Sequence, residues 1–282
     1  MDKSAKRGDY ASARDLLVDA AIAAGEVAMR YFRSGELTVA RVDSKHGGSP
    51  VTEADLAADA FLLARLGPAF PDAAFLSEER EDGPERLAHS RLLVIDPIDG
   101  TRAFVSGDPR WAVSVALVEA GRPVAGVVHA PALGLTFAAA RGAGALLNGA
   151  AIVASSRSVL AGGRAAGPKP MVEAIGIEAG APFILEPKVP SLAYRMCLVA
   201  SGAVDIALAS EKSHDWDVAA ADLILEEAGA HLVALDGAGL IYNRRETRHG
   251  VLIAAPASLL GALVAMSNRG LAPRRDAMRA NH

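Results

Sequence analysis

The sequence predicts a layered protein of mixed α/β or α+β class, and three observations carry this prediction. The chain has 282 residues, of which 51% are hydrophobic and 22% charged, enough to bury a full core. Helical periodicity dominates the N-terminal segment, while short apolar runs separated by turn residues fill the middle. Helical and extended patterns then alternate after about residue 190, which favours layers of helices on sheets.

The first third of the chain is predicted to hold two helices. Apolar residues recur at helical spacing from about 9 to 33, with Gly35 closing the segment. Residues 37–42 have the composition of a strand, and 47–50 that of a turn. Thr52 is placed to cap a second helix that runs to about residue 66.

The middle third is predicted to be mostly strands. The runs 73–76 and 92–95 are short and apolar, and each is followed by acidic residues. Two longer segments, 111–119 and 124–129, read as neighbouring strands joined by a turn at 121–123. Another hairpin is expected where strand 135–139 meets the glycine-rich turn at 142–144.

The last third gives a mixed signal. Residues 155–190 contain several glycines and prolines and indicate no clear element. Beyond them the patterns predict helices at 191–200 and 218–228, and strands at 205–208, 231–235 and 251–254. No repeat or low-complexity linker is present. The mix of helices and hairpins suggests two similar-sized halves, 1–150 and 151–282, that meet near residue 150.

Composition excludes several classes of function. The formal net charge of −4 leaves no basic excess for a nucleic-acid polymer, although a phosphorylated metabolite can still bind through cations. No apolar stretch is long enough to span a membrane, and charged residues interrupt the position of an export signal. The single cysteine, Cys197, lies in an apolar run and is interpreted as a core residue, so we expect a cytoplasmic protein without disulfides.

The most informative segment is Asp96-Pro97-Ile98-Asp99-Gly100-Thr101. An apolar strand delivers Asp96, and Pro97 is expected to stop the strand. Two carboxylates so close repel each other unless a proton or cation lies between them, and Mg²⁺ with the Ile98 carbonyl as a further ligand meets that need. If Gly100 and Thr101 begin a helix, their N–H groups can cradle a phosphate.

Two further acidic segments accompany it, Glu78-Glu79 after an apolar strand and Asp215-Trp216-Asp217 before a helix. Each has a simpler interpretation: a loop turn at 96–100, a solvated strand end at Glu78, and an N-cap at Asp217. Their joint occurrence favours a metal site. Neither a Walker-type phosphate loop nor an HExxH zinc motif is present.

These motifs resemble those of the inositol monophosphatase superfamily, D-P-[IL]-D-G-T and W-D-x-A-A, and the resemblance extends from about residue 10 to 255. It implies a five-layered αβαβα sandwich of the inositol monophosphatase/fructose-1,6-bisphosphatase type. Most metal ligands would lie in the first half, and Asp217 with the specificity residues in the second. The implied ligands of two to three Mg²⁺ ions are Glu78, Asp96, the Ile98 carbonyl, Asp99 and Asp217.

The same resemblance implies a catalytic role for Asp55 and Thr101, which would position and deprotonate the attacking water, with Glu78 supporting catalysis. Gly100, Thr101 and Asp217 would also contact the substrate. The implied activity is magnesium-dependent hydrolysis of a phosphomonoester, without a covalent enzyme intermediate.

Within the superfamily, several details resemble bacterial 3'(2'),5'-bisphosphate nucleotidases. They are the run Leu76-Ser77-Glu78-Glu79, a basic residue at Arg195, and the late segment 240–243. The expected reaction is then hydrolysis of adenosine 3',5'-bisphosphate to AMP and phosphate, with inhibition by lithium. Arg195, Lys212 or Lys45 would bind the second phosphate.

Two alternatives stay open. One is an inositol-1-monophosphatase or another phosphatase of small sugar or alcohol phosphates, in which Glu211 would bind the sugar. The other is a catalytically inactive, anion-binding regulatory module on the same fold. The partner in each case is a small phosphorylated metabolite, and the chain can be a monomer or a homodimer.

Overall fold

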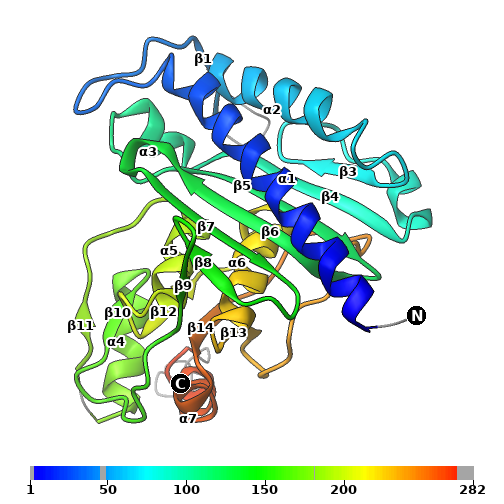
Figure 1. The fold of residues 1–282 in the computed structure, drawn as a ribbon. Coiled ribbons are helices and arrows are strands. Elements are labelled where there is room, and N and C mark those ends of the chain that lie inside the picture. Colours follow the sequence, from blue (N-terminus) through cyan, green and yellow to red (C-terminus); the bar gives the residue numbers. More distant parts are fainter. Residues whose placement is uncertain (1–2, 45–48, 181, 272–282) are drawn as a thin grey trace, which may run out of the picture.

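The computed structural model describes residues 3–44, 49–180 and 182–271, and these residues stack in five layers (Figure 1). Helices α1 (Lys3–Met29) and α2 (Glu53–Leu66) form the first layer, over a large sheet. Helices α5 (Leu192–Ala200) and α6 (Asp215–Glu227) lie between this sheet and a small one. Helices α4 (Lys169–Glu178) and α7 (Ala257–Gly270) form the last layer, which confirms the αβαβα sandwich.

In the described part of the chain the large sheet has seven strands in sequence order. They are β3 (Ala74–Ser77), β4 (Arg91–Asp99), β5 (Ala112–Glu119), β6 (Arg122–Ala130), β7 (Leu135–Ala140), β8 (Ala145–Leu147) and β9 (Ala150–Ile152). β3 and β4 pair in parallel and the others antiparallel, so β3 and β4 end at the same edge.

The small sheet has five strands in the order β11-β10-β12-β14-β13, counted over the same described residues. They are β10 (Arg164–Ala166), β11 (Ile184–Leu185), β12 (Ile206–Ala209), β13 (Ala230–Ala234) and β14 (Leu252–Pro256). The strands from β3 to β9 therefore belong to the large sheet and those from β10 onward to the small one. Division of the chain into two halves stays a prediction. A short hairpin, β1 (Val42–Ser44) with β2 (Pro50–Thr52), leads into α2.

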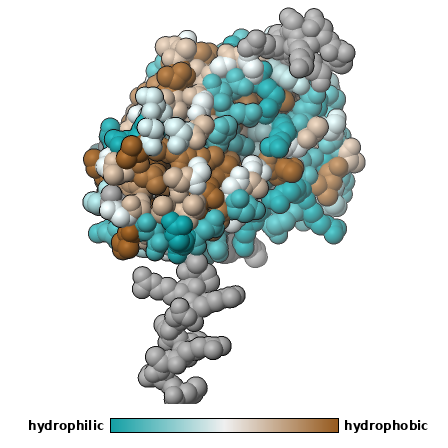
Figure 2. All heavy atoms as spheres, turned by 90° about the horizontal axis from the view of Figure 1, so that it is seen from below, coloured by the Kyte–Doolittle hydropathy of each residue, from teal (hydrophilic) through white to brown (hydrophobic). Residues whose placement is uncertain are grey.

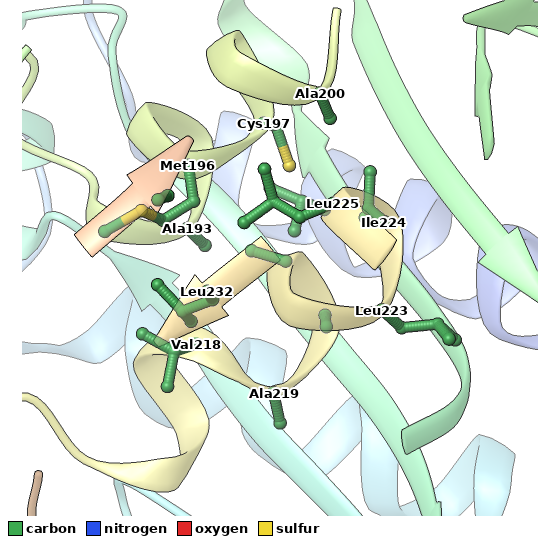
Figure 3. Packing of buried hydrophobic residues seen from close by; sticks show 14 of the residues in the cluster. Ala193, Met196, Cys197, Ala200, Val218, Ala219, Leu223, Ile224, Leu225 and Leu232 are labelled. Carbon is green, nitrogen blue, oxygen red and sulfur yellow. The ribbon is translucent and has the colours of Figure 1, made fainter. Parts of the chain in front are cut away.

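Among the described residues, three hydrophobic clusters fill the spaces between the layers. One packs α1 and α2 on the large sheet, and another packs α4 and α7 on the small sheet. The cluster in the middle buries α5 and α6 on both sides, and Figure 3 shows Met196 and Cys197 of α5 among Val218, Leu225 and Leu232. Cys197 is fully buried and burial raises its pKa, which confirms it as a core residue.

The end of the molecule with α4 and β11 exposes apolar side chains. Figure 2 views the protein from below and shows hydrophobic residues gathered on part of this face. Ile177 is 74% exposed, and the edge strand β11 exposes Ile184 and Leu185. A groove of about 600 Å³ runs among them, lined by Val172, Gly176, Ile177, Phe183 and Leu185.

Several predicted elements are confirmed, among them the helix that Thr52 caps and the helix after Ser191. The strand predicted at 37–42 is wrong, because the chain is irregular there and β1 begins only at Val42. The weak region 155–190 contains β10, α4 and β11. Their strands are too short to show a period of two, so pattern alone did not reveal them.

No described helix is both long and apolar enough to cross a membrane. A cytoplasmic location stays a prediction.

Asp222 on α6 has a strongly altered acidity, which predicts pH-dependent stability. Burial raises the pKa of Asp222 to about 7. The hydrogen bond from the Tyr242 hydroxyl and the charges of Arg122 and Arg141 lower this pKa, but by less. The folded state favours the protonated carboxyl of Asp222. This group therefore stabilises the fold at low pH, and the stabilisation is lost as the pH rises through 7.

Asp222→Asn removes this titration. The free energy of unfolding of the variant relative to the wild type should rise by ~1–2 kcal/mol from about pH 5 to about pH 8, a modest value because the side chain is partly exposed. Denaturant unfolding at the two pH values measures this difference. Asp236→Asn, the same change in an exposed turn, is the control, and an equal pH trend in the wild type and Asp222→Asn contradicts the prediction.

Candidate active site

Three carboxylates converge at one edge of the large sheet. Oxygens of Asp96, Asp99 and Asp217 all lie within 4.8 Å of one another. Asp96 and Asp99 come from β4 and are buried, while Asp217 comes from the first turn of α6 and is partly buried. Residues more than 100 positions apart in the sequence therefore form one acidic cluster.

A bulge in β4 turns both aspartates toward the site. Pairing with β5 shifts register between Asp96, which faces Ser114, and Asp99, which faces Ala112. The prediction that Pro97 ends the strand is wrong, since β4 continues to Asp99. Proline is tolerated here because a bulged residue donates no ladder hydrogen bond. Inside the bulge, the Ile98 N–H donates to Asp96 Oδ1 at 3.0 Å.

Asp99 sits at the N-terminus of α5. Its Oδ2 accepts hydrogen bonds of 2.6 Å from the Ser191 hydroxyl and from the Ala193 N–H. Burial raises the pKa of Asp99 to about 6, and these bonds oppose the rise. The helix therefore fixes one oxygen of Asp99. A bound cation would favour the charged carboxylate.

Asp217 is held by its own helix. His214 is the N-cap of α6 and its N–H donates to Asp217 Oδ2 at 2.6 Å, so Asp217 is the third helical residue and not the cap. The His214 ring stacks on Trp216 at 4.5 Å and its Nδ1 lies 3.0 Å from Thr247 Oγ1. These contacts give His214 a supporting position beside the cluster.

Glu78 lies close to the cluster but outside its tight group. It follows β3, and its N–H donates to the Ile95 carbonyl of β4 at 3.2 Å. Burial is the main cause of the raised pKa of Asp99, and the negative charge of Glu78 adds to it. Nearby, Asp59 accepts 2.6 and 2.7 Å hydrogen bonds from Ser77 and Arg80, which bracket Glu78 in the sequence. These two contacts were not predicted from the sequence.

The predicted pair Asp55 and Thr101 meets beside the cluster. Thr101 Oγ1 lies 3.4 Å from Asp55 Oδ1 and 3.2 Å from the Ile98 carbonyl. Asp55 Oδ2 accepts from both the N–H and the hydroxyl of Thr52, which closes a capping box at the start of α2. The carboxylate of Asp55 is thus locked in place, with one oxygen facing the Thr101 hydroxyl.

Gly100 connects β4 to the short helix α3 (Thr101–Val105) in the left-handed conformation, with φ of 93°. A Cβ atom at this position would lie 3.2–3.3 Å from the backbone of Ser191, the residue that holds Asp99. Both the conformation and the close approach require glycine.

Gly100→Ala should therefore lower stability by about 1–2 kcal/mol from backbone conformation alone. It should also reduce activity, because the Ser191 contact with Asp99 must shift. Gly134→Ala is the matched control, since Gly134 has a φ of 64° but open space around it. Equal activity of the two variants in a phosphate-release assay would contradict the predicted displacement.

The residues predicted to contact the substrate differ in their surroundings. The Arg195 guanidinium donates to the Val189 carbonyl at 2.7 and 3.1 Å and to the Leu208 carbonyl at 3.0 Å, and burial lowers its pKa. Glu211 and Lys212 are exposed, and Lys212 has an unusual φ of 99°. Lys45 lies outside the described residues. Their binding roles stay predictions.

Ser191 and Ala193 are partners of Asp99 that were not predicted from the sequence. Ser191 follows Pro190 at the start of an apolar helix, a typical N-cap position, so its capping role could be read from the sequence. Its bond to Asp99 could not, since 92 residues separate the two.

The donor set suits a divalent cation. Mg²⁺ prefers carboxylate, carbonyl and water oxygens, and the cluster offers three carboxylates with the Ile98 carbonyl and Glu78 close by. Such crowding of acidic groups in a buried place is unfavourable without a positive charge. The residues present therefore fit a metal centre.

Comparison with protein families gives one match over nearly the whole chain. The family model described as "Inositol monophosphatase family" matches residues 9–270. Solved structures agree: the extragenic suppressor protein suhB of Bartonella henselae has a TM-score of 0.78 and 28% identity, over 92% of this chain and 99% of that one. An IMPase of Thermotoga maritima has a TM-score of 0.77 and 28% identity, with 91% and 97% covered.

Curated relatives carry three different substrate names. "Histidinol-phosphatase" of Mycobacterium tuberculosis is 37% identical over 241 residues, covering 79% of this chain and 88% of the relative. "3'(2'),5'-bisphosphate nucleotidase CysQ" of Aggregatibacter actinomycetemcomitans is 32% identical, with 82% and 87% covered. "Inositol monophosphatase 2" of Solanum lycopersicum is 34% identical, with 79% and 88% covered.

Proposed function

Because the chain belongs to the inositol monophosphatase family, we propose that it is a magnesium-dependent phosphomonoesterase of small phosphorylated metabolites. The observation that carries this proposal is the convergence of Asp96, Asp99 and Asp217 beside the Asp55–Thr101 pair. The inactive regulatory module is disfavoured, because both the ligand set and the acid–base pair are present.

Bound Mg²⁺ ions, two to three by family expectation, would supply positive charge for the phosphate oxygens and make a water molecule acidic at neutral pH. Asp96, Asp99 and Asp217 would hold them, with the Ile98 carbonyl and Glu78. The Thr101 hydroxyl can accept a proton from the attacking water while passing its own to Asp55 Oδ1. The N–H groups at Gly100 and Thr101 would contact the phosphate.

For the substrate we propose adenosine 3',5'-bisphosphate, cleaved to AMP and phosphate, with lithium as an inhibitor. The run Leu76-Ser77-Glu78-Glu79 and similarity to the CysQ nucleotidases support this choice. Lys212, exposed and near α6, is available for the second phosphate, whereas Arg195 would have to exchange its bonds to backbone carbonyls. Inositol 1-phosphate is the alternative, and similarity to a histidinol-phosphatase adds histidinol phosphate as a further candidate.

Phosphate release by the purified chain with Mg²⁺ tests both the proposed phosphatase activity and the proposed substrate. Adenosine 3',5'-bisphosphate, inositol 1-phosphate and histidinol phosphate are compared by kcat/KM at matched concentrations. We expect the nucleotide to be preferred by at least about tenfold, a difference of about 1.4 kcal/mol in transition-state binding. Preference for another ester overturns the substrate, and the absence of Mg²⁺-dependent release from all three overturns the enzyme.

A further inference from the structure

A partly buried polar contact joins the chain segment that follows Glu78 to a loop that is itself bonded to the helix of Asp217. Arg86 lies in the 3₁₀ helix Pro84–Ala88, in the segment that follows Glu78. Asn243 lies in the loop between β13 and β14. We name the contact between the Arg86 and Asn243 side chains the Arg86–Asn243 clasp.

The clasp is reciprocal and nearly saturates both side chains. Arg86 Nη1 donates to Asn243 Oδ1 at 2.8 Å, and Nη2 donates to the Arg244 carbonyl at 2.9 Å. In return, Asn243 Nδ2 donates to the carbonyls of Arg86 at 3.3 Å and of His89 at 3.2 Å. The Arg86 side chain is only 4% exposed, so the bonds that it donates are largely shielded from water, whereas the bond from Asn243 to His89 is exposed.

On the Glu78 side, the clasp anchors the segment through Asp82. Arg86 Nε and Nη2 bind the two oxygens of Asp82 at 2.6 and 2.8 Å, a bidentate pair of fixed geometry. Asp82 is four residues after Glu78. The neighbouring carboxylates of Asp82 and Asp215 raise the pKa of Arg86, so its charge is retained.

On the Asp217 side, the clasp reaches the start of α6. The Asn243 N–H donates to Asp215 Oδ2 at 3.2 Å, and Asp215 Oδ1 lies 2.8 Å from His249 Nε2. Asp215 is fully buried and is the first residue of the helix whose first turn carries Asp217. The loop around Asn243 is therefore tied both to the Glu78 segment and to the helix of Asp217.

We propose that the Arg86–Asn243 clasp is a positioning pair that sets the separation between Glu78 and the aspartate cluster, and with it the affinity for divalent cations. This inference rests on the proposed metal-dependent function. Its physical basis is that residues which orient metal ligands commonly change metal affinity by about 10–100-fold when mutated.

Asn243 allows a clean test because its φ is +58°, a conformation that glycine adopts without strain. Asn243→Gly deletes the side chain but keeps the backbone N–H that binds Asp215. Asn148→Gly is the matched control. Asn148 also has a positive φ, 49°, and its amide also bridges loop backbone, to Thr136 and Gly134, without contact to either clasp segment.

The experiment titrates Mn²⁺ into each protein and follows the free ion by electron paramagnetic resonance, with thermal unfolding recorded in EDTA. We expect Asn243→Gly and Arg86→Lys to bind Mn²⁺ about tenfold more weakly than the wild type. The double variant should lose little more, because both changes break one contact. Asn148→Gly and Arg91→Lys, which alters the separate Arg91–Asp72 pair, should keep wild-type affinity.

The outcomes separate the two proposals. Wild-type affinity in Asn243→Gly and Arg86→Lys overturns the clasp, even if both unfold at lower temperature. An affinity loss in Asn148→Gly as large as that in Asn243→Gly overturns it as well. Absence of Mn²⁺ binding by the wild-type chain overturns the proposed metal centre and, with it, the clasp.

Discussion

Asp96→Asn should lose at least about 10²-fold in kcat with Mg²⁺, the scale of loss when one group that stabilises transition-state charge is removed. The side chain keeps its shape, and its amide oxygen can still accept the Ile98 N–H bond seen at Asp96 Oδ1. It loses the negative charge that a cation requires from the cluster. Steady-state kinetics over a range of Mg²⁺ concentrations measures the effect.

The fold of this variant should survive. Removing one of three crowded carboxylates relieves repulsion in the absence of metal, so thermal unfolding in EDTA should occur at or above the wild-type temperature. Asp72→Asn, at an exposed carboxylate just before β3, controls for the substitution itself. Near-normal turnover by Asp96→Asn would defeat the assignment of the cluster as the active centre.

Thr101→Val should reduce kcat by about 10²–10⁴-fold, the usual contribution of a general acid–base group. Valine has the shape of threonine but cannot pass a proton to Asp55, whose Oδ1 lies 3.4 Å from the hydroxyl. Metal binding should be unchanged, since Thr101 is not among the three converging carboxylates. The change should therefore appear in kcat at saturating Mg²⁺.

A matched control is Thr136→Val, which removes a partly buried hydroxyl that contacts His129 and not the cluster. It should retain activity. If Thr101→Val instead shows normal kcat and a raised requirement for Mg²⁺, the hydroxyl supports the metal site through the Ile98 carbonyl and is not a proton carrier.

Features that depend only on residues close together in the sequence, such as helix caps, could be predicted from the sequence. The capping box of Thr52 and Asp55 needs only residues within one helical turn, and both the helix and its cap are confirmed. Gly100 is required by its own left-handed backbone, and the acidic residues of β4 follow an apolar strand. The resemblance to the family predicted the order of layers, and the family match covers nearly the whole chain, residues 9–270.

Hydrogen bonds that depend on packing against another element could not be predicted from the sequence. Pro97 was expected to end a strand, yet the register shift with β5 accommodates it. The bonds of the Arg195 guanidinium to the carbonyls of Val189 and Leu208 also depend on tertiary packing, while its contact with a phosphate stays a prediction. In both cases the hydrogen bonds are decided by which backbone groups another element brings within hydrogen-bonding distance.

The layered fold, the family and the aspartates that offer a metal site could be predicted from the sequence, because each is encoded in a local pattern or motif. Three contacts could be seen only in the folded chain: the oxygen of Asp99 that α5 holds, the bond of Glu78 to β4, and the meeting of Arg86 with Asn243. These contacts join residues up to 157 positions apart, and no local propensity encodes such a distance. They form only when packed layers exclude water and leave each buried polar group to find its partner within the protein.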